Sequence, residues 1–284
     1  MDVDDTPAEA AVRAEARAWL EPVAKRRGEG DGDWRSFRAK TEDQDAVHLE
    51  MAQAWQRTKF EAGWAAPHWP KEHGGRALSG IEASVFSQEE SAFDVMARFF
   101  MIGIDMAGPT LMAHGTPEQQ KRFLEPMLRG DESWCQLFSE PGSGSDLASL
   151  GTRAELDGDE WVLNGQKVWT SSAHTSDWGM CLARTNPDAP KHAGITYFLV
   201  DMHSPGVTVR PLRQIDGAIH FNEVFLDDVR VPADRMVGDV NDGWRVAATT
   251  LGAERTAIGT GGQTGWKDVT EVARRLGRTG EPSV

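Results

Sequence analysis

The order of three sequence textures constrains the fold of this chain most strongly. Residues 1–130 carry helical periodicity, residues 131–237 form short strand-like runs separated by turns, and helical periodicity returns after residue 243. Helices that precede and follow a block of strands are typical of α+β proteins, not of βαβ alternation. We therefore expect an N-terminal α-helical domain at 1–130, a middle antiparallel β-barrel or sandwich at 131–237 and a partial C-terminal α-helical domain at 238–284.

Local patterns place the elements within these regions. The expected helices are Ala8–Leu20, Thr41–Ala62, Ser79–Phe93, Val95–Met112, Pro117–Gly130, a helix from Gly243 to about Gly261 and a segment near Lys267–Leu276. Thr116-Pro117-Glu118-Gln119 is a capping box with proline at the first helical position. The expected strands are Trp134–Ser139, Gly151–Leu156, Glu160–Leu163, Gln166–Thr170, Trp178–Arg184, Ile195–Val200, Val207–Pro211 and Asn222–Val229. Asn164-Gly165 and Asp157-Gly158-Asp159 are the expected turns, and residues 28–33 an expected connector.

Composition narrows the class of partner. The 284 residues carry a formal net charge of −14, which argues against nucleic acid or an anionic membrane because both require a basic face. The two cysteines, Cys135 and Cys181, provide neither metal-ligand spacing nor a disulfide framework, so we expect no metal site and a reducing compartment. The acidic N-terminus lacks the pattern of a signal peptide, and no uninterrupted apolar stretch could span a bilayer. We therefore expect a cytoplasmic protein.

Glu254 stands on an otherwise apolar helical stripe. Its neighbours on that face, at intervals of three and four residues, are Trp244, Ala247, Leu251 and Ile258. A carboxylate on such a face is expected to be either paired or functional. One interpretation is a buried salt bridge with Arg255 or Arg245, and the other is a desolvated carboxylate that acts as a general base.

Three short segments follow one another in a fixed order. Cys135–Asp146 (CQLFSEPGSGSD) reads as a strand that enters a Gly- and Ser-rich turn, whose N–H groups and hydroxyls can surround a polar or anionic ligand. Asn164–Ser172 (NGQKVWTSS) and Leu251–Gly259 (LGAERTAIG) come later. Taken alone, the first is an ordinary turn and Trp169 an ordinary core aromatic. Together, the three segments resemble the acyl-CoA dehydrogenase family of flavoproteins.

This resemblance implies FAD as the cofactor. The implied cofactor-binding residues are Gln136, Phe138, Ser139, Gly144, Ser145, Trp169 and Ser171. Backbone groups near Phe138 and Ser139 would bond the pyrimidine edge of the flavin. Trp169 would pack on its face, and Ser171 would offer a hydroxyl to N5. The family often has an aromatic residue in place of Gln136 and threonine in place of Ser139 and Ser171, so the hydroxyls are retained and the aromatic contact is not.

The same resemblance implies a reaction. Family members convert an acyl-CoA to a 2-enoyl-CoA, with a glutamate removing the α-proton and flavin N5 accepting the β-hydride. A minority, including isovaleryl- and long-chain-type enzymes, carry that glutamate on the first helix of the C-terminal bundle, immediately before an arginine. Glu254-Arg255 matches this position, so Glu254 is the implied base. The implied acyl-CoA contacts are Ser145, Gly252 and Arg255.

The chain ends within the region that resembles the C-terminal helical bundle. Only the first bundle helix and part of the second are expected here, so a truncated or naturally short member, or a partner chain that supplies the rest, is expected. The implied partners are an acyl-CoA substrate, electron-transfer flavoprotein or a similar acceptor, and other subunits of a homo- or hetero-oligomer. Two alternatives stay open: a non-catalytic subunit or fragment that acts through partner association, and an oxidase or monooxygenase on the same fold.

Overall fold

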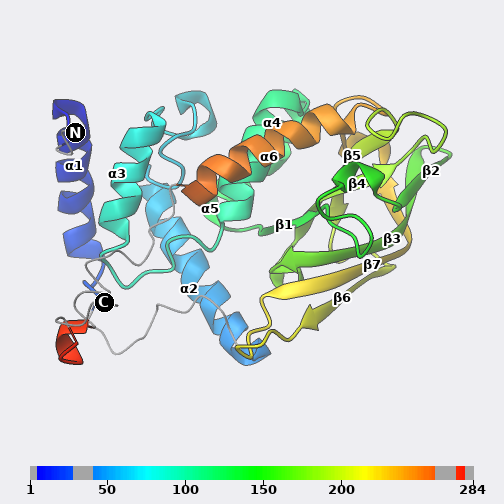
Figure 1. The fold of residues 1–284 in the computed structure, drawn as a ribbon. Coiled ribbons are helices and arrows are strands. Elements are labelled where there is room, and N and C mark those ends of the chain that lie inside the picture. Colours follow the sequence, from blue (N-terminus) through cyan, green and yellow to red (C-terminus); the bar gives the residue numbers. More distant parts are fainter. Residues whose placement is uncertain (1–4, 28–40, 260–272, 279–284) are drawn as a thin grey trace.

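The computed structural model describes residues 5–27, 41–259 and 273–278. Helices and strands occupy two halves of the molecule (Figure 1), which confirms the predicted α+β class with helices before and after the strands. Strand β1 (Trp134–Leu137) leads from the helical half into the sheet, and α6 (Gly243–Gly259) returns from the sheet across the helical half. The predicted connector at 28–33 lies outside the described residues, as does most of the predicted segment near 267–276.

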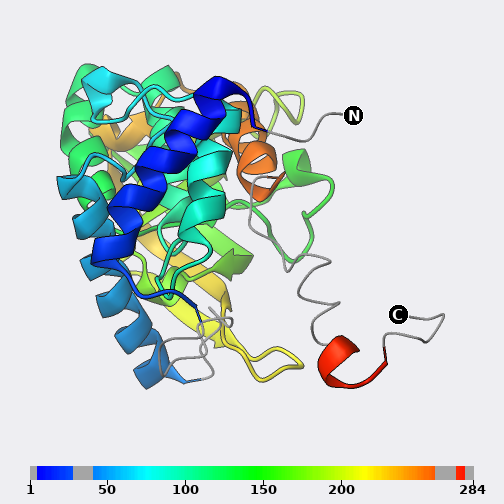
Figure 2. The ribbon, with the colours of Figure 1, turned by 90° about the vertical axis from the view of Figure 1, so that its left-hand side faces the viewer.

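In the described part of the chain, five helices precede the strands: α1 (Pro7–Val23), α2 (Glu42–Glu61), α3 (Gly80–Glu90), α4 (Gly108–His114) and α5 (Pro117–Arg129). Capping boxes open three of them, because Thr6, Ser79 and Thr116 each accept a hydrogen bond from the backbone three residues on. The box at Thr116 confirms the predicted helix start, and Gly130 ends α5 in the left-handed conformation. Helix α1 lies along α3 on the outside of the molecule (Figure 2). None of the described helices is long and apolar enough to cross a bilayer.

The prediction of one helix over Val95–Met112 is wrong. The helical elements there are the π-helical turn η2 (Ile102–Ala107) and the short α4, and residues 97–100 form a turn. The indole of Trp69 packs so closely on Gly108 that an added Cβ would lie 2.0 Å from its ring, and its Nε1 donates to the Ile104 carbonyl at 2.9 Å. Pro109 also lacks an N–H for a regular helical hydrogen bond. Trp69, which is distant in the sequence, thus packs against the segment where the wide π-helical turn replaces a regular α-helix.

The eight described strands form one mixed sheet. Besides β1 they are β2 (Arg153–Asp157), β3 (Glu160–Ser171), β4 (Trp178–Arg184), β5 (Ile195–Asp201), β6 (Val207–Leu212), β7 (Phe221–Pro232) and β8 (Met236–Val237). Their order is β6-β7-β3-β2-β4-β5-β8, with β1 paired to β4. Most neighbours are antiparallel, as predicted, but β1 and β2 both run parallel to β4. Four short 3₁₀ turns complete the described elements: η1 (Lys71–His73), η3 (Leu147–Ser149), η4 (Ala173–Thr175) and η5 (Ala233–Arg235).

The predicted turn at Asn164-Gly165 is wrong, because β3 runs through it as one strand of 12 residues. The pairing of β3 with β7 shifts register at this point, so the dipeptide forms an irregularity in the strand. The Asn164 side chain donates to the Asp228 carboxylate at 2.9 Å and accepts from the Asp228 N–H at 3.0 Å. Gly165 is required because an added Cβ would lie 2.3 Å from the Thr152 hydroxyl. The hairpin between β2 and β3 turns at Gly158, with φ of +68°, as the Asp-Gly-Asp sequence predicts.

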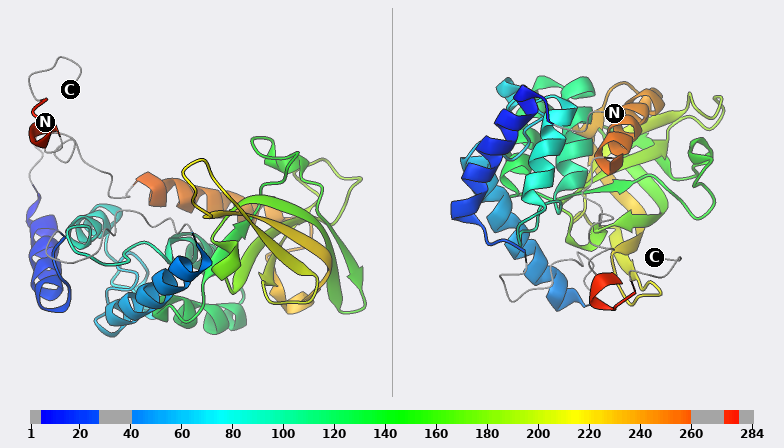
Figure 3. Two further views of the ribbon diagram at one scale, coloured as in Figure 1. Left: turned by 90° about the horizontal axis from the view of Figure 1, so that it is seen from below. Right: turned by 60° about the vertical axis from the view of Figure 1, so that its left-hand side comes forward.

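Strands β4 and β5 are buried on both faces. Figure 3 shows the sheet curling on itself beside the helices. Met180, Leu182 and Leu199 contribute to a core shared with the helical half, whereas Cys181 and Phe198 point into the curled sheet. Alternate residues of a strand point to opposite faces, so the nearly continuous apolar runs of β4 and β5 follow from burial on both sides. This shared core fixes β1 and α6 relative to the sheet.

Candidate active site

The first predicted segment begins on β1, whose alternate residues face different cores. Cys135 and Leu137 lie inside the curled sheet, and Trp134 and Phe138 lie in the core shared with the helices. Gln136 shares the latter side and is half-buried. Its amide Nε2 donates to Oε2 of Glu254 on α6 at 3.4 Å. The first and third predicted segments therefore meet through Gln136 and Glu254.

Helix α6 buries one face, and Glu254 lies next to it. Its buried side chains are Val246, Ala247, Thr250 and Ala257. The Thr250 hydroxyl lies 2.9 Å from that of Thr110 on α4 and 3.3 Å from the Tyr197 hydroxyl on β5, which fixes the rotation of the helix. Glu254 is half-buried at the margin of this face. Compared with the stripe that the sequence predicts, the buried face of α6 is therefore rotated towards Thr250. The side chain of Ile258 lies outside the described part of the chain.

No arginine in the described part of the chain neutralises Glu254. Arg245 pairs at 2.5 Å with Asp242, which directly precedes α6, and Arg255 is exposed with no ion pair to Glu254 among the described residues. The expected alternative of a salt bridge with Arg245 or Arg255 is therefore not what the structure contains. A half-buried carboxylate whose neighbour is an amide is available for proton transfer.

A buried ion pair supports the turn that follows β1. Lys167 on β3 is fully buried, and its Nζ donates to the Glu140 carboxylate at 2.8 Å and to the carbonyls of Phe138 and Leu182. Glu140 also accepts from the backbone N–H groups of residues 151 and 152. Burial acts to raise the pKa of Glu140, but Lys167 and these hydrogen bonds outweigh it and hold the pKa below its ordinary value. Sequence reasoning did not single out this pair, although both members lie in the predicted segments.

Trp169 is exposed, with 62% of its surface accessible, and its backbone φ is +60°. Its ring meets Phe221 edge-on at a centroid separation of 6.1 Å. Positive φ is unfavourable for a bulky residue and is found where the surroundings impose it. The interpretation of Trp169 as a core aromatic is therefore wrong, and an indole held out of the core by its backbone is typical of a ligand contact.

The other predicted site residues lie along the loop and strand between these two points. The Ser139 carbonyl accepts from the Val168 N–H at 2.9 Å, so residues 136–139 extend from beside Glu254 to the strand that carries Trp169. Ser171, half-buried, pairs with Phe221 at the end of β3. Gly144 and Ser145 are exposed, and an added Cβ on Gly144 or on Gly252 would meet no atom within 4 Å.

Sequence reasoning missed a cavity in the helical half. It has a volume of about 320 Å³ and lies between α2, α3, η2 and α6. Its wall includes Lys59 and Glu90, which stand among polar residues in the sequence, and Asp105, which stands in the apolar run at 99–107. Only the fold shows that these three charged residues line one cavity. Among the described residues, no group of three or more His, Cys, Asp and Glu side chains is placed to hold a metal ion.

Comparison with known proteins assigns this architecture to a protein family. Residues 6–131 match the acyl-CoA dehydrogenase N-terminal domain, and residues 135–229 match the acyl-CoA dehydrogenase middle domain. The chain belongs to the acyl-CoA dehydrogenase family. Members of this family are flavin-dependent oxidoreductases, as the resemblance of the three segments implied.

Individual relatives are longer than this chain. Acyl-CoA dehydrogenase FadE34 of Mycobacterium tuberculosis is 55% identical over 217 residues, covering 76% of this chain and 30% of FadE34. Acyl-CoA dehydrogenase IpdE1 of the same organism is 47% identical over 240 residues, covering 83% of this chain and 62% of IpdE1. The solved structure of the Tcur3481-Tcur3483 steroid ACAD superposes with a TM-score of 0.77 at 33% identity, covering 99% of this chain and 71% of that chain. The chain thus spans less than two thirds of either curated relative.

Proposed function

We propose that this chain binds FAD and an acyl-CoA and dehydrogenates the acyl group to the 2-enoyl-CoA, with Glu254 taking the α-proton. The observation that carries the proposal is the contact between Gln136 and Glu254 at 3.4 Å. Glu254 is half-buried and has no arginine partner among the described residues. The contact links it to β1, the strand that leads into the Gly- and Ser-rich turn. A carboxylate in this setting can receive a proton from a substrate carbon held beside it.

The residues around the turn fit FAD. Trp169 offers a large exposed ring of the kind that packs on a planar cofactor. Ser139 and Ser171 carry hydroxyls on either side of it in sequence, and the exposed turn at Gly144 and Ser145 leaves room for a bulky polar group such as a pyrophosphate. Phe138 and Gln136 complete the proposed set. When bound, FAD supplies the acceptor for the two electrons that the acyl group loses.

Three side chains then have distinct proposed tasks. Glu254 takes the α-proton, and the Gln136 amide, by donating to the carboxylate, holds it in one orientation. Arg255 is exposed next to the base and places a positive charge where the CoA portion would lie. An added Cβ on Gly252 would meet no atom within 4 Å, and Ser145 is exposed, so both positions leave space for the thioester arm.

The acyl group is proposed to be steroid-derived. The Tcur3481-Tcur3483 protein is named a steroid ACAD, and it aligns with nearly the whole of this chain. The cavity of about 320 Å³ beside α6 is of the size class that receives ring-bearing ligands. Electron-transfer flavoprotein or a similar protein is the proposed electron acceptor.

A second candidate function is a non-catalytic subunit that acts through partner association. The observation in its favour is that a solved structure which aligns with 99% of this chain is named after two components. The name Tcur3481-Tcur3483 joins two components, and we propose by analogy that this chain also works in a homo- or hetero-oligomer. A visible flavin spectrum of the purified protein, alone or with a co-purifying partner, separates the two functions. No flavin in either preparation favours the non-catalytic subunit.

The proposed reaction is tested by anaerobic mixing with a panel of acyl-CoAs while the visible absorption of bound FAD is followed. The unaltered protein should bleach with its preferred acyl-CoA. Glu254→Gln keeps the shape and most of the hydrogen bonding, so FAD should remain bound while bleaching slows by at least about a hundredfold. Glu254→Asp, which keeps a displaced carboxylate, should retain part of the rate. Equal bleaching by the Gln variant would place the base elsewhere.

A further inference from the structure

The cavity in the helical half starts at α6, next to the proposed base. Ala253, Thr256 and Ala257 form one wall, and Ala253 directly precedes Glu254. The opposite walls come from α2, from the loop at residues 64–68, from α3 and from the turn before η2. They include apolar rings and small side chains: Trp64, Ala65, Ala83, Phe86 and Phe100. An apolar cavity with a few polar groups is typical of a small-molecule site.

Two charged residues at this cavity satisfy each other. Lys59 Nζ lies 3.2 Å from Glu90 Oε1, and the two side chains are only 6% and 5% exposed. Lys59 also donates to the Ala97 carbonyl at 3.3 Å, and the Trp55 indole N–H donates to the same Glu90 oxygen at 2.7 Å. Because each charge is compensated by its partner, this pair does not call for a charged ligand.

A second polar pair is less completely satisfied. His68 Nε2 lies 3.6 Å from Asp105 Oδ1, beyond ordinary hydrogen-bond length, and both residues line the cavity with side chains 33% and 25% exposed. Burial raises the pKa of Asp105, against the opposing effects of His68, Arg98 and Lys59, and burial lowers the pKa of His68. A neutral imidazole donates a hydrogen bond from one ring nitrogen, and a carboxyl donates one whenever it carries its proton and accepts one otherwise.

The remaining cation is already engaged. Arg98 donates to the Ala257 carbonyl of α6 at 2.8 Å, and so connects the turn before η2 to the wall that carries the proposed base. The cavity wall, in the described residues, thus holds two cations, Lys59 and Arg98, and two carboxyls, Glu90 and Asp105. Lys59 is paired with Glu90 and Arg98 with a backbone carbonyl, so the polar groups that the described wall leaves for a ligand are His68 and Asp105, which suit a neutral oxygen.

We propose that this cavity is a subsite for the far end of the acyl group and that His68 and Asp105 bind a neutral carbonyl or hydroxyl oxygen there. The inference rests on the proposed function for its link to an acyl-CoA. It adds that these two residues make the protein prefer an oxygen-bearing ring over a plain hydrocarbon end.

The direct test uses two ring compounds of matched shape, cyclooctanone and methylenecyclooctane, which differ in C=O against C=CH₂. Their binding to the full chain is measured by saturation-transfer NMR and by competition between them. The ketone should bind about fivefold or more tightly, as one additional neutral hydrogen bond predicts. Equal binding of the two probes, or binding of neither, overturns the proposal. The measurement needs neither FAD nor turnover, so its failure is separate from the failure of Glu254 as the base.

Variants assign the preference to the proposed residues. Asp105→Leu and His68→Phe should each reduce the preference for the ketone towards unity while methylenecyclooctane still binds. Asp105→Asn keeps a hydrogen-bond donor and should retain most of the preference. Ala83→Phe, which places a ring into the cavity, should abolish binding of both probes. A preference that persists in both the Leu and Phe variants, each shown to be folded by its circular dichroism, overturns the assignment.

Discussion

At the scale of single residues, Trp169 is better explained by binding a ligand than by packing in the core. Its ring is 62% exposed and its backbone is left-handed, two features that cost stability and return little packing within the chain. Trp161, in contrast, is 8% exposed and belongs to the core of the curled sheet. The two tryptophans lie on the same strand, so they form a matched pair for substitution.

Trp169→Gly is expected to change the free energy of unfolding by no more than about 1 kcal/mol, because glycine relieves the positive φ while its own flexibility costs a similar amount. Flavin occupancy should fall. Trp161→Ala should cost about 3–5 kcal/mol, as for other buried aromatic residues. Urea titration of the apo-proteins and the ratio of flavin to protein absorption check both statements. Flavin occupancy unchanged in Trp169→Gly would remove this residue from the cofactor site.

Lys167 and Glu140 give a second prediction for single residues. Lys167→Met leaves the 10% exposed Glu140 side chain without its cation and should destabilise the protein by about 3–5 kcal/mol. The double variant Lys167→Met with Glu140→Gln should recover part of this loss, because neither residue then carries an uncompensated buried charge. Chemical denaturation of the two single variants and the double variant measures the coupling. Strictly additive losses would show that the pair does not act as a unit.

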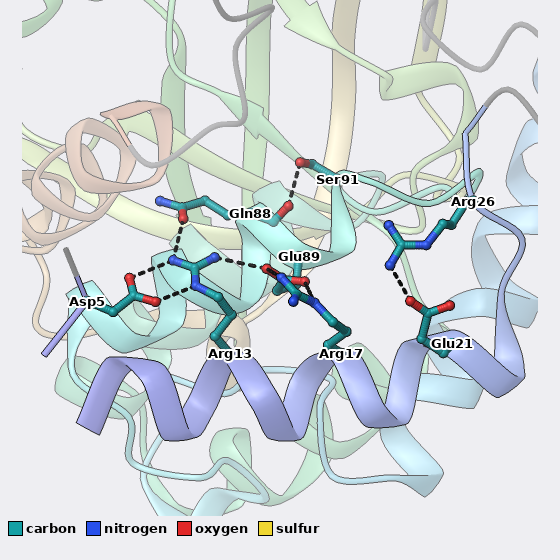
Figure 4. Close-up of polar contacts among 8 residues, drawn as sticks. All are labelled: Asp5, Arg13, Arg17, Glu21, Arg26, Gln88, Glu89 and Ser91. Carbon is teal, nitrogen blue, oxygen red and sulfur yellow. Dashed lines mark hydrogen bonds and ion pairs between the residues drawn. The ribbon is translucent and has the colours of Figure 1, made fainter. Parts of the chain in front are cut away.

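At the scale of elements, one carboxylate links α1 to α3 beside their apolar contact. Glu89 on α3 has a side chain only 9% exposed and receives hydrogen bonds at 2.9 Å from both Arg13 and Arg17 of α1 (Figure 4). The pair between Glu21 and Arg26, in the same view, has both side chains more than 40% exposed. Exposed pairs contribute little, whereas a buried carboxylate with two guanidinium partners contributes more.

Glu89→Gln is therefore expected to lower the free energy of unfolding by about 2 kcal/mol, and the control Glu21→Gln by no more than about 0.5 kcal/mol. Chemical denaturation at neutral pH measures both values.

The same carboxylate makes stability depend on pH. Burial acts to raise the pKa of Glu89, but the opposite effect of Arg17 and Arg13 is larger, so the folded pKa lies below its ordinary value. The stabilisation is then present above the unfolded pKa, near 4.3, and is lost as the pH falls through the folded pKa. Unfolding measured between neutral pH and about pH 3 should show a smaller acid destabilisation in Glu89→Gln. Parallel pH profiles would contradict this account.

The elements also show which features the sequence could predict. Thr116-Pro117-Glu118-Gln119 is a local signal, and the helix begins where it predicts. Asn164-Gly165 is equally local but ambiguous, because the contacts of Asn164 with Asp228 and of Gly165 with Thr152 decide in favour of a strand irregularity. The π-helical turn at Ile102–Ala107 could not be predicted, since it accompanies the insertion of Trp69, more than 30 positions earlier. Contacts distant in sequence override local propensity in both cases.

At the scale of the whole molecule, the helical half and the sheet share one core. Residues of α5, β1, β4, β5 and α6 all contribute to it. The candidate site lies where these elements meet, which is why Gln136 and Glu254, 118 positions apart, are in contact. The class of fold and the two segments that meet there could be predicted from the sequence, whereas the exposure of Trp169 and the inward-facing charges of the cavity could not. The domain boundaries at residues 130 and 237 remain predictions.

The central claim is that Glu254 removes the α-proton of an acyl-CoA. Its most direct measurement is the exchange of that proton for deuterium, followed by NMR in deuterated water with FAD-loaded protein under anaerobic conditions, in the assembly from which the chain is isolated. This exchange reports proton removal without requiring net oxidation. The unaltered protein should exchange the α-protons, and Glu254→Gln should do so at least about a hundredfold more slowly with FAD still bound. Equal exchange rates in the two proteins would contradict the account.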